Sequence, residues 1–103
     1  LSSNKKMVND INIEESKAYI DNGASILDVR TKEEFDGGHI ENSMNIDVHS
    51  PTFNEQVEAL DKNKIYVVYC ASGGRSASVV QTMMGLGFTN AYNMSGGIAG
   101  WKK

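Results

Sequence analysis

The sequence of 103 residues contains only one cysteine and one proline, and it has no long apolar run. A single cysteine excludes an internal disulfide, so the fold does not need an oxidising compartment. This favours a cytoplasmic location, and a cell-envelope location stays open if a signal segment preceded Leu1. His39 and His49 lack partners at zinc-ligand spacing, so we expect no metal and no cofactor. No run approaches the ~18 apolar residues of a membrane-spanning helix, so we expect no span.

The sequence also lacks a strong excess of either charge. Its formal net charge is −3, and acidic and basic residues are interspersed along the chain. Because no basic stripe is present, we expect no nucleic-acid partner. The length corresponds to one domain with an ordinary core. We expect a polar N-terminal segment over residues 1–6, a single domain over residues 7–103, and a monomer.

The sequence does contain short apolar runs that alternate with helical patterns. The strongest strand is predicted over residues 64–70, where β-branched and aromatic residues dominate. Further strands are predicted over residues 24–30, 43–48 and 90–94, with a short one near residues 6–10. Continuous apolar runs are typical of a parallel sheet that is covered on both faces.

Helix start signals lie between these predicted strands. Capping boxes predict helices that begin after Asn12 and Thr31, and a cap at Ser50 followed by proline predicts a third. A fourth helix is predicted over residues 76–86, with its stop at Gly87. The alternation of strands and helices predicts a small open α/β sheet, in which ligands bind beyond the carboxyl ends of the strands.

The stretch YVVYCASGGRSASVV places Cys70 at the carboxyl end of the strongest strand, directly before a loop of small residues. An unperturbed thiol titrates near pH ~8.5, so a thiolate at neutral pH needs stabilisation by its surroundings. Gly73 and Gly74 let successive backbone N–H groups turn toward one centre, and Arg75 adds a positive charge. The helix that begins near Ser76 adds the partial positive charge of its N-terminus.

Two interpretations of Cys70 follow from the residues alone. A lone cysteine at the end of an apolar strand is more often an inert core residue, and a glycine pair is a common turn. The conjunction of strand, cysteine, small-residue loop, arginine and helix start is much less common. We therefore interpret Cys70 as a reactive cysteine.

Three motifs resemble those of the rhodanese-domain sulfurtransferases. The loop C-A-S-G-G-R-S, from Cys70 to Ser76, resembles the active-site loop of that family, C-x-x-G-x-R-S. The stretch DVRTKEEFDGGHIENSMNID, residues 28–47, resembles the upstream signature, and MSGGIAGWKK, residues 94–103, resembles the carboxyl-terminal signature. The resemblance implies a rhodanese-like α/β fold, an open five-stranded parallel sheet flanked by helices on both faces.

The resemblance also implies a sulfurtransferase that moves a sulfane sulfur from thiosulfate, polysulfide or a persulfide donor to a thiol or cyanide. In that activity Cys70 is the nucleophile and sulfur carrier, and no cofactor is needed. Arg75 closes the loop and offers charge to the leaving anion. The residues expected to bind the substrate and cradle the persulfide are Ala71, Ser72, Gly73, Gly74 and Ser76.

Four further residues take supporting roles in this interpretation. The resemblance implies that Asp28 and Arg30 brace the site from a neighbouring strand end, and a plain strand-end ion pair stays open as the alternative. His39 is interpreted as a structural residue of the GGHI segment. Trp101 is expected to pack the carboxyl terminus.

The sequence departs from the family pattern at several positions. Asn42 and Ser43 replace the usual Gly-Ala pair and Asp47 replaces the usual proline, which bears on packing. Ala71 stands where many thiosulfate-using members have a second basic residue. We therefore expect weak use of thiosulfate and a preference for polysulfide or a thiol-bound persulfide.

Two other functions stay open at this point. Cysteine phosphatases and arsenate reductases of the same fold have five residues between cysteine and arginine, whereas four residues separate Cys70 from Arg75. A binding module that docks a partner or passes on sulfur within an assembly is the second alternative. The expected partners are small sulfur-donor anions and thiol acceptors, with a protein of a sulfur relay as an open option.

Overall fold

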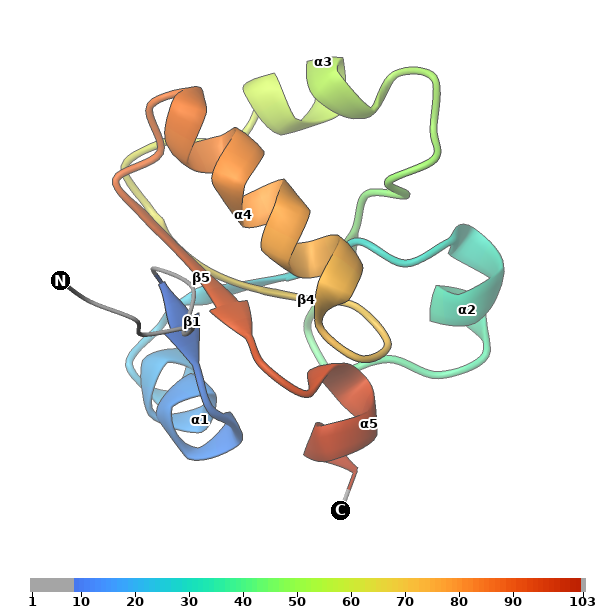
Figure 1. The fold of residues 1–103 in the computed structure, drawn as a ribbon, viewed down its shortest axis with the longest axis vertical. Coiled ribbons are helices and arrows are strands. Elements are labelled where there is room, and N and C mark those ends of the chain that lie inside the picture. The colour runs from blue at the N-terminus through green and yellow to red at the C-terminus, as the bar shows by residue number, and fades with distance from the viewer. Residues whose placement is uncertain (1–8, 103) are drawn as a thin grey trace, which may run out of the picture.

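The computed structural model describes residues 9–102, which form a five-stranded sheet with helices on both faces (Figure 1). The order of the strands in the sheet is β1-β5-β4-β2-β3, and every neighbouring pair is parallel. The strands are β1 (Asp10–Ile11), β2 (Ser25–Asp28), β3 (Met44–Asn45), β4 (Ile65–Tyr69) and β5 (Asn90–Met94). The predicted α/β class and the five-stranded parallel sheet are confirmed. The predicted polar segment over residues 1–6 lies outside the described residues, and the domain boundary stays a prediction.

The middle strand β4 is the most thoroughly buried, because four of its five residues are inaccessible to solvent. It pairs with β2 on one side and with β5 on the other. The unbroken apolar run that predicted this strand therefore reflects its place inside the sheet, where both of its faces are covered. Cys70 follows directly at its carboxyl end.

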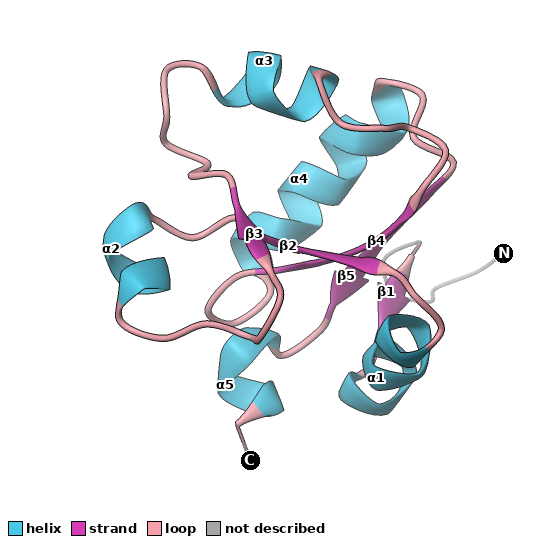
Figure 2. Cartoon of the chain, turned by 180° about the vertical axis from the view of Figure 1, so that it is seen from behind, coloured by secondary structure: helices cyan, strands magenta, loops and turns pink. Residues whose placement is uncertain are grey.

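Helices pack on the two faces of the sheet and bury a separate apolar core on each (Figures 1 and 2). One core joins Val68 and Cys70 to residues of α3 and α4, among them Val57 and Val80. The other core joins Tyr69 and its neighbours to residues of α1 and α5. The helices are α1 (Ile13–Asp21), α2 (Lys32–Asp36), α3 (Phe53–Glu58), α4 (Gly74–Gly85) and α5 (Gly97–Trp101).

Both predicted capping boxes are present. Asn12 Oδ1 accepts a hydrogen bond from the backbone N–H of Glu15 at 2.7 Å, and Glu15 Oε1 accepts one from the backbone N–H of Asn12 at 2.8 Å. Thr31 and Glu34 make the same reciprocal pair at the start of α2, at 3.2 and 3.0 Å. These bonds satisfy N–H groups that the first turn of a helix leaves without partners.

The three later helices follow the predictions from the sequence only in part. α4 begins at Gly74 and stops as predicted: the backbone N–H of Phe88 donates to Met83 O at 3.0 Å, and that of Gly87 donates to Met84 O at 3.2 Å. This is the Schellman arrangement. The prediction of a cap at Ser50 was wrong, because Pro51 lies in a turn and α3 begins at Phe53. Helix α5 was not predicted, since its glycine-rich sequence has a low helix propensity.

Candidate active site

The sulfur of Cys70 lies inside the loop that connects β4 to α4. The side chain is 1% exposed. Its Sγ accepts hydrogen bonds from the backbone N–H of Gly73 at 3.1 Å and of Ser76 at 3.4 Å, and Ser76 Oγ lies 3.4 Å away. The backbone of Gly73 has φ +115°, a left-handed conformation that glycine adopts without a steric cost. The loop therefore curls around the sulfur as the small-residue sequence predicted.

Two opposing effects act on the pKa of Cys70. Burial raises it, because a charged sulfur loses contact with water. Hydrogen bonds from Ser76, Gly73 and Ser72 favour the thiolate and outweigh burial, so the pKa lies below its ordinary value. A cysteine with a lowered pKa at the end of a parallel strand has the properties of a nucleophile.

The carboxyl-terminal motif holds the loop from the other side. The backbone N–H of Ile98 donates to Cys70 O at 2.9 Å, and that of Ala99 donates to Ala71 O at 3.2 Å. Gly97 has φ +59°, and a Cβ atom there would lie 2.5 Å from Ala71 C and O. Only glycine fits between the two segments at position 97, and the backbone φ of +87° also favours glycine at position 96.

Arg75 does not extend freely into the loop but forms a bidentate ion pair with Glu34 of α2. Nη1 donates to Oε1 at 2.9 Å and Nη2 donates to Oε2 at 3.1 Å. The Arg75 guanidinium and the Thr31 backbone lower the pKa of Glu34 to about 2. Sequence reasoning missed this role of Glu34, although the capping box had already fixed its position on the helix.

Asp28 and Arg30 form a second, buried ion pair. Arg30 Nη2 lies 2.8 Å from Asp28 Oδ2 and also donates to Gly38 O at 2.8 Å. The Arg30 guanidinium carbon lies 5.7 Å from the centre of the Tyr69 ring, and Tyr69 Oη accepts from the Ile40 backbone at 3.1 Å. The pair thus fixes the segment around Gly38 and contacts the residue before Cys70, rather than the sulfur itself.

The remaining predicted residues lie at the rim of the site or away from it. Ser72 and Gly74 are exposed, and Ala71 is half-buried. His39 Nδ1 bonds to Phe35 O at 2.8 Å, and its ring stacks on the Phe35 ring with 3.7 Å between centres. Trp101, the last residue of α5, is half-buried and packs against the apolar core that α1 and α5 cover. The contacts of His39 and Trp101 are those of structural residues.

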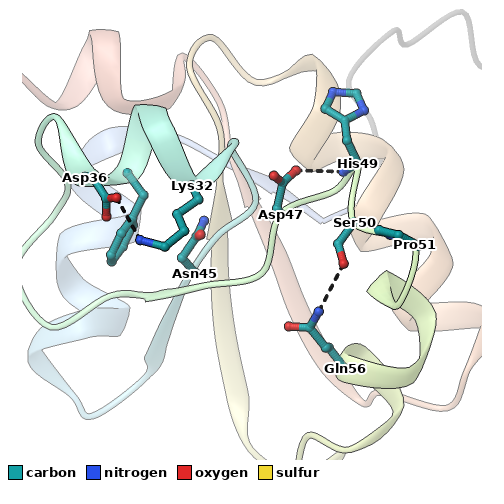
Figure 3. A pocket seen from close by; sticks show the side chains of 9 residues that line it. Lys32, Asp36, Asn45, Asp47, His49, Ser50, Pro51 and Gln56 are labelled. Atoms are coloured by element: carbon teal, nitrogen blue, oxygen red, sulfur yellow. Dashed lines mark hydrogen bonds and ion pairs between the residues drawn. The ribbon is translucent and has the colours of Figure 1, made fainter.

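A groove of about 700 Å³ begins at the carboxyl end of β3 (Figure 3). Its walls are partly fixed by bonds between their own side chains, since Lys32 pairs with Asp36 at 2.8 Å and Gln56 donates to Ser50 Oγ at 3.3 Å. The lining residues are Lys32, Phe35, Asp36, Asn45, Asp47, His49, Ser50, Pro51 and Gln56. The cysteine loop contributes no residue to it.

Among residues 9–102, no helix is long and apolar enough to cross a membrane. Within the same range, no three His, Cys, Asp or Glu side chains gather in a way that could hold a metal ion. The groups described above are the sulfur of Cys70, the amides around it and two ion pairs. Together with the parallel sheet, these define an α/β protein whose candidate centre is a cradled cysteine.

Comparison with known proteins identifies the family. The model of the rhodanese-like domain matches residues 12–103, and this chain belongs to that family. The thiosulfate sulfurtransferase GlpE of Pseudomonas syringae pv. syringae (strain B728a) is 33% identical over 89 residues, which cover 86% of this chain and 82% of that protein. A crystal structure of a rhodanese-like domain protein from Staphylococcus aureus is 35% identical, has a TM-score of 0.79 and is matched over 90% of both chains.

A further relative is a plant protein that is not named as a sulfurtransferase. Protein HIGH ARSENIC CONTENT 1, mitochondrial, of Arabidopsis thaliana is 31% identical over 104 residues, which cover 91% of this chain. The match spans 62% of that longer protein. The family to which this chain belongs thus includes proteins named as sulfurtransferases and one named for arsenic.

Proposed function

We propose that this protein is a sulfurtransferase that carries a sulfane sulfur as a persulfide on Cys70. The observation that carries the proposal is the sulfur of Cys70, which accepts N–H bonds from Gly73 and Ser76 at the carboxyl end of β4. The same loop places the N-terminus of α4 next to the sulfur. Backbone donors and a helix N-terminus stabilise negative charge, whether it lies on a thiolate or on a persulfide.

The reaction is a double displacement. The Cys70 thiolate attacks the outer sulfur of the donor, a new S–S bond forms, and the donor remnant leaves with the electron pair of the broken bond. When the donor is thiosulfate, that remnant is sulfite. A thiolate or cyanide then attacks the outer sulfur of the persulfide, and the electron pair of the S–S bond returns to Cys70. Neither step needs a metal or an organic cofactor.

The charges of the loop support a donor whose transferred sulfur bears little charge. Arg75 is the only basic residue from Cys70 to Ser76, and Glu34 neutralises it through the bidentate pair. Ala71 adds no charge. Thiosulfate is a dianion, so it gains little electrostatic attraction here, whereas a polysulfide or thiol-bound persulfide depends less on such attraction.

Oxyanion chemistry of the arsenate reductase or phosphatase kind is the second candidate that the sequence leaves open, and one relative is named for arsenic content. Two features of the loop oppose it. The ring from Cys70 to Arg75 has four intervening residues, and the guanidinium already uses two of its N–H groups in the bidentate pair with Glu34. A tetrahedral oxyanion on the cysteine needs donors for each of its oxygens, and these two features leave few donors.

Parallel assays separate the two candidates. We expect thiocyanate formation from cyanide with thiosulfate or polysulfide as donor, loss of this activity in Cys70→Ser, and no turnover of arsenate or a phenyl phosphate. Turnover of either oxyanion without thiocyanate formation would instead support the second candidate. Thiocyanate formation that survives in Cys70→Ser would contradict both.

A further inference from the structure

A chain of hydrogen-bonded polar side chains leads from the Cys70 sulfur to the edge of the sheet. Ser76 Oγ lies 3.4 Å from Cys70 Sγ and 2.6 Å from Asn93 Oδ1. Asn93 Nδ2 in turn donates to Asp10 Oδ1 at 2.9 Å. Ser76 is fully buried and Asn93 is 4% exposed, so water does not compete for the bond between them, whereas Asp10 is half-buried. Neither Asn93 nor Asp10 has a part in the reaction described above.

The carboxylate of Asp10 determines which way the amide of Asn93 points. An ionised carboxylate only accepts hydrogen bonds, so the NH₂ end of Asn93 must face it. The oxygen of Asn93 therefore faces Ser76. Strand pairing keeps the arrangement in place, because Asp10 of β1 lies opposite Asn93 of β5 and the Asn93 backbone donates to Asn9 O at 2.8 Å.

The hydroxyl of Ser76 has a single proton and three acceptors within reach. These are Asn93 Oδ1 at 2.6 Å, Gly73 O at 3.2 Å and Cys70 Sγ at 3.4 Å. Two oxygens 2.6 Å apart repel each other unless a proton lies between them, and Asn93 Oδ1 has none to give. The proton therefore belongs to the bond with Asn93, and a lone pair of Ser76 Oγ faces the sulfur.

We propose that Asn93, oriented by Asp10, is a positioning residue. Its Oδ1 accepts the hydrogen bond of the Ser76 hydroxyl, so that this hydroxyl does not donate to the Cys70 sulfur. The sulfur is then stabilised by the backbone amides of Gly73 and Ser76, and the Ser76 hydroxyl contributes less to the lowered pKa of Cys70 than its 3.4 Å distance from the sulfur alone suggests. The consequence for catalysis rests on the proposed function. Thiolates with fewer hydrogen bonds are stronger nucleophiles, and Sγ loses its charge once it carries the outer sulfur. The arrangement thus favours the loaded form over the free thiolate.

The variant Asn93→Leu tests the proposal, since leucine has a similar volume but no acceptor. The released Ser76 hydroxyl then donates to the thiolate, as hydrogen bonds to charged acceptors are strong. We expect the pH midpoint of Cys70 alkylation by iodoacetamide to fall by about one unit. The limiting rate at high pH should fall about threefold, because nucleophilicity decreases with pKa. An unchanged or raised midpoint in the folded variant overturns the proposal.

A double-mutant cycle with Ser76→Ala separates positioning from a structural effect. The double variant Ser76→Ala/Asn93→Leu should have the same alkylation midpoint as Ser76→Ala alone, because the hydroxyl is absent from both. A general disturbance of the loop would instead make Asn93→Leu shift the midpoint both with and without the hydroxyl. Arg75, whose charge acts on Cys70, is the same in all variants.

Asp10→Asn is the second variant, for use if Asn93→Leu does not fold. It removes the charge that orients Asn93 and should lower the midpoint in the same direction by a smaller amount, and an unchanged midpoint there also overturns the proposal. Alkylation needs no sulfur donor. A failure of Cys70 to accept sulfur would therefore contradict the proposed function without touching this result.

Discussion

Arg75 of α4 and Glu34 of α2, 41 residues apart in the sequence, form a bidentate ion pair beside the cysteine loop. Their side chains are 32% and 35% exposed, so the pair lies at the rim and not in the core. The contact joins two of the three sequence motifs. It also neutralises the charge that would attract an anionic sulfur donor.

The first prediction follows from this pair. Glu34→Gln keeps the capping box, because glutamine accepts the same bond from Thr31, but leaves Arg75 with an uncompensated charge. We expect the KM for thiosulfate to fall about three- to tenfold, corresponding to ~1 kcal/mol at a partly exposed site. The KM for polysulfide should change less, and the gain should shrink as salt rises.

Steady-state kinetics with both donors, at low and high ionic strength, measure this effect. Glu33→Gln is the matched control, because Glu33 is an exposed neighbour on the same helix. An equal fall in the thiosulfate KM for both variants would mean that net charge, and not the pair, is responsible. No fall in Glu34→Gln would contradict the account of donor preference.

The second prediction concerns stability in acid. The pKa of Glu34 lies at about 2 in the folded protein, below the ordinary 4.5. A lowered pKa means that the unfolded chain binds the proton first, so the contribution of the pair is fully present above pH ~4.5 and is lost as the pH falls toward 2. The Arg75 and Glu34 side chains are about one third exposed, so solvent screening limits the contribution of the pair to the free energy of unfolding to ~1 kcal/mol.

Urea unfolding at a series of pH values tests the acid prediction. The free energy of unfolding of the parent protein should exceed that of Glu34→Gln by ~1 kcal/mol at pH 7. The difference should narrow below pH ~4.5 and vanish only below pH ~2, because Glu34 is still half ionised at its folded pKa of about 2. A difference that stays constant over this range would show that the carboxylate charge contributes nothing.

The third prediction concerns the contact between the two glycine-containing motifs. In Gly97→Ala the new Cβ would lie 2.5 Å from the backbone of Ala71, and the residue would keep φ +59°. Because backbone cannot move as a flexible side chain can, we expect a loss of ~2–4 kcal/mol and a melting temperature lower by ~10 °C or more. Sulfur transfer should fall as well, since the loop carries the donors to Cys70.

Gly85→Ala is the control for that substitution. Gly85 lies in the exposed last turn of α4, and a Cβ there meets no atom within 4 Å. Alanine stabilises such a helical position by ~0.5–1 kcal/mol. Equal melting temperatures for the two variants would contradict the close approach of α5 to the loop.

Local chemistry explains which parts of this structure could be predicted from the sequence. The apolar run before Cys70, the two capping boxes and the stop at Gly87 depend on neighbours within a few residues, so the sequence shows them directly. The strand predicted over residues 43–48 is present as β3, although only Met44 and Asn45 pair with β2. The start of α3 was predicted too early, because Pro51 lies in a turn that precedes the helix.

The contacts that define the site are long-range, and the sequence gives no separate signal for them. The Glu34–Arg75 pair, the bonds from Ile98 to Cys70 and the Ser76–Asn93 bond each join segments that only the sheet brings together. The family motifs contain most of these residues but do not show which of them contact one another. Asp28 and Arg30 illustrate this, since their contacts with Gly38 and Tyr69 appear only in three dimensions.

The most direct test of sulfur transfer is the intact mass of the protein after brief exposure to polysulfide or thiosulfate, with Cys70→Ser treated in parallel. The account predicts a gain of one sulfur atom in the parent protein, its removal by cyanide or a thiol, and no gain in Cys70→Ser. Loading should be more complete with polysulfide than with thiosulfate at equal concentration. A parent protein that gains no sulfur from either donor, or a Cys70→Ser variant that gains the same mass, would contradict the assignment of Cys70 as the sulfur carrier.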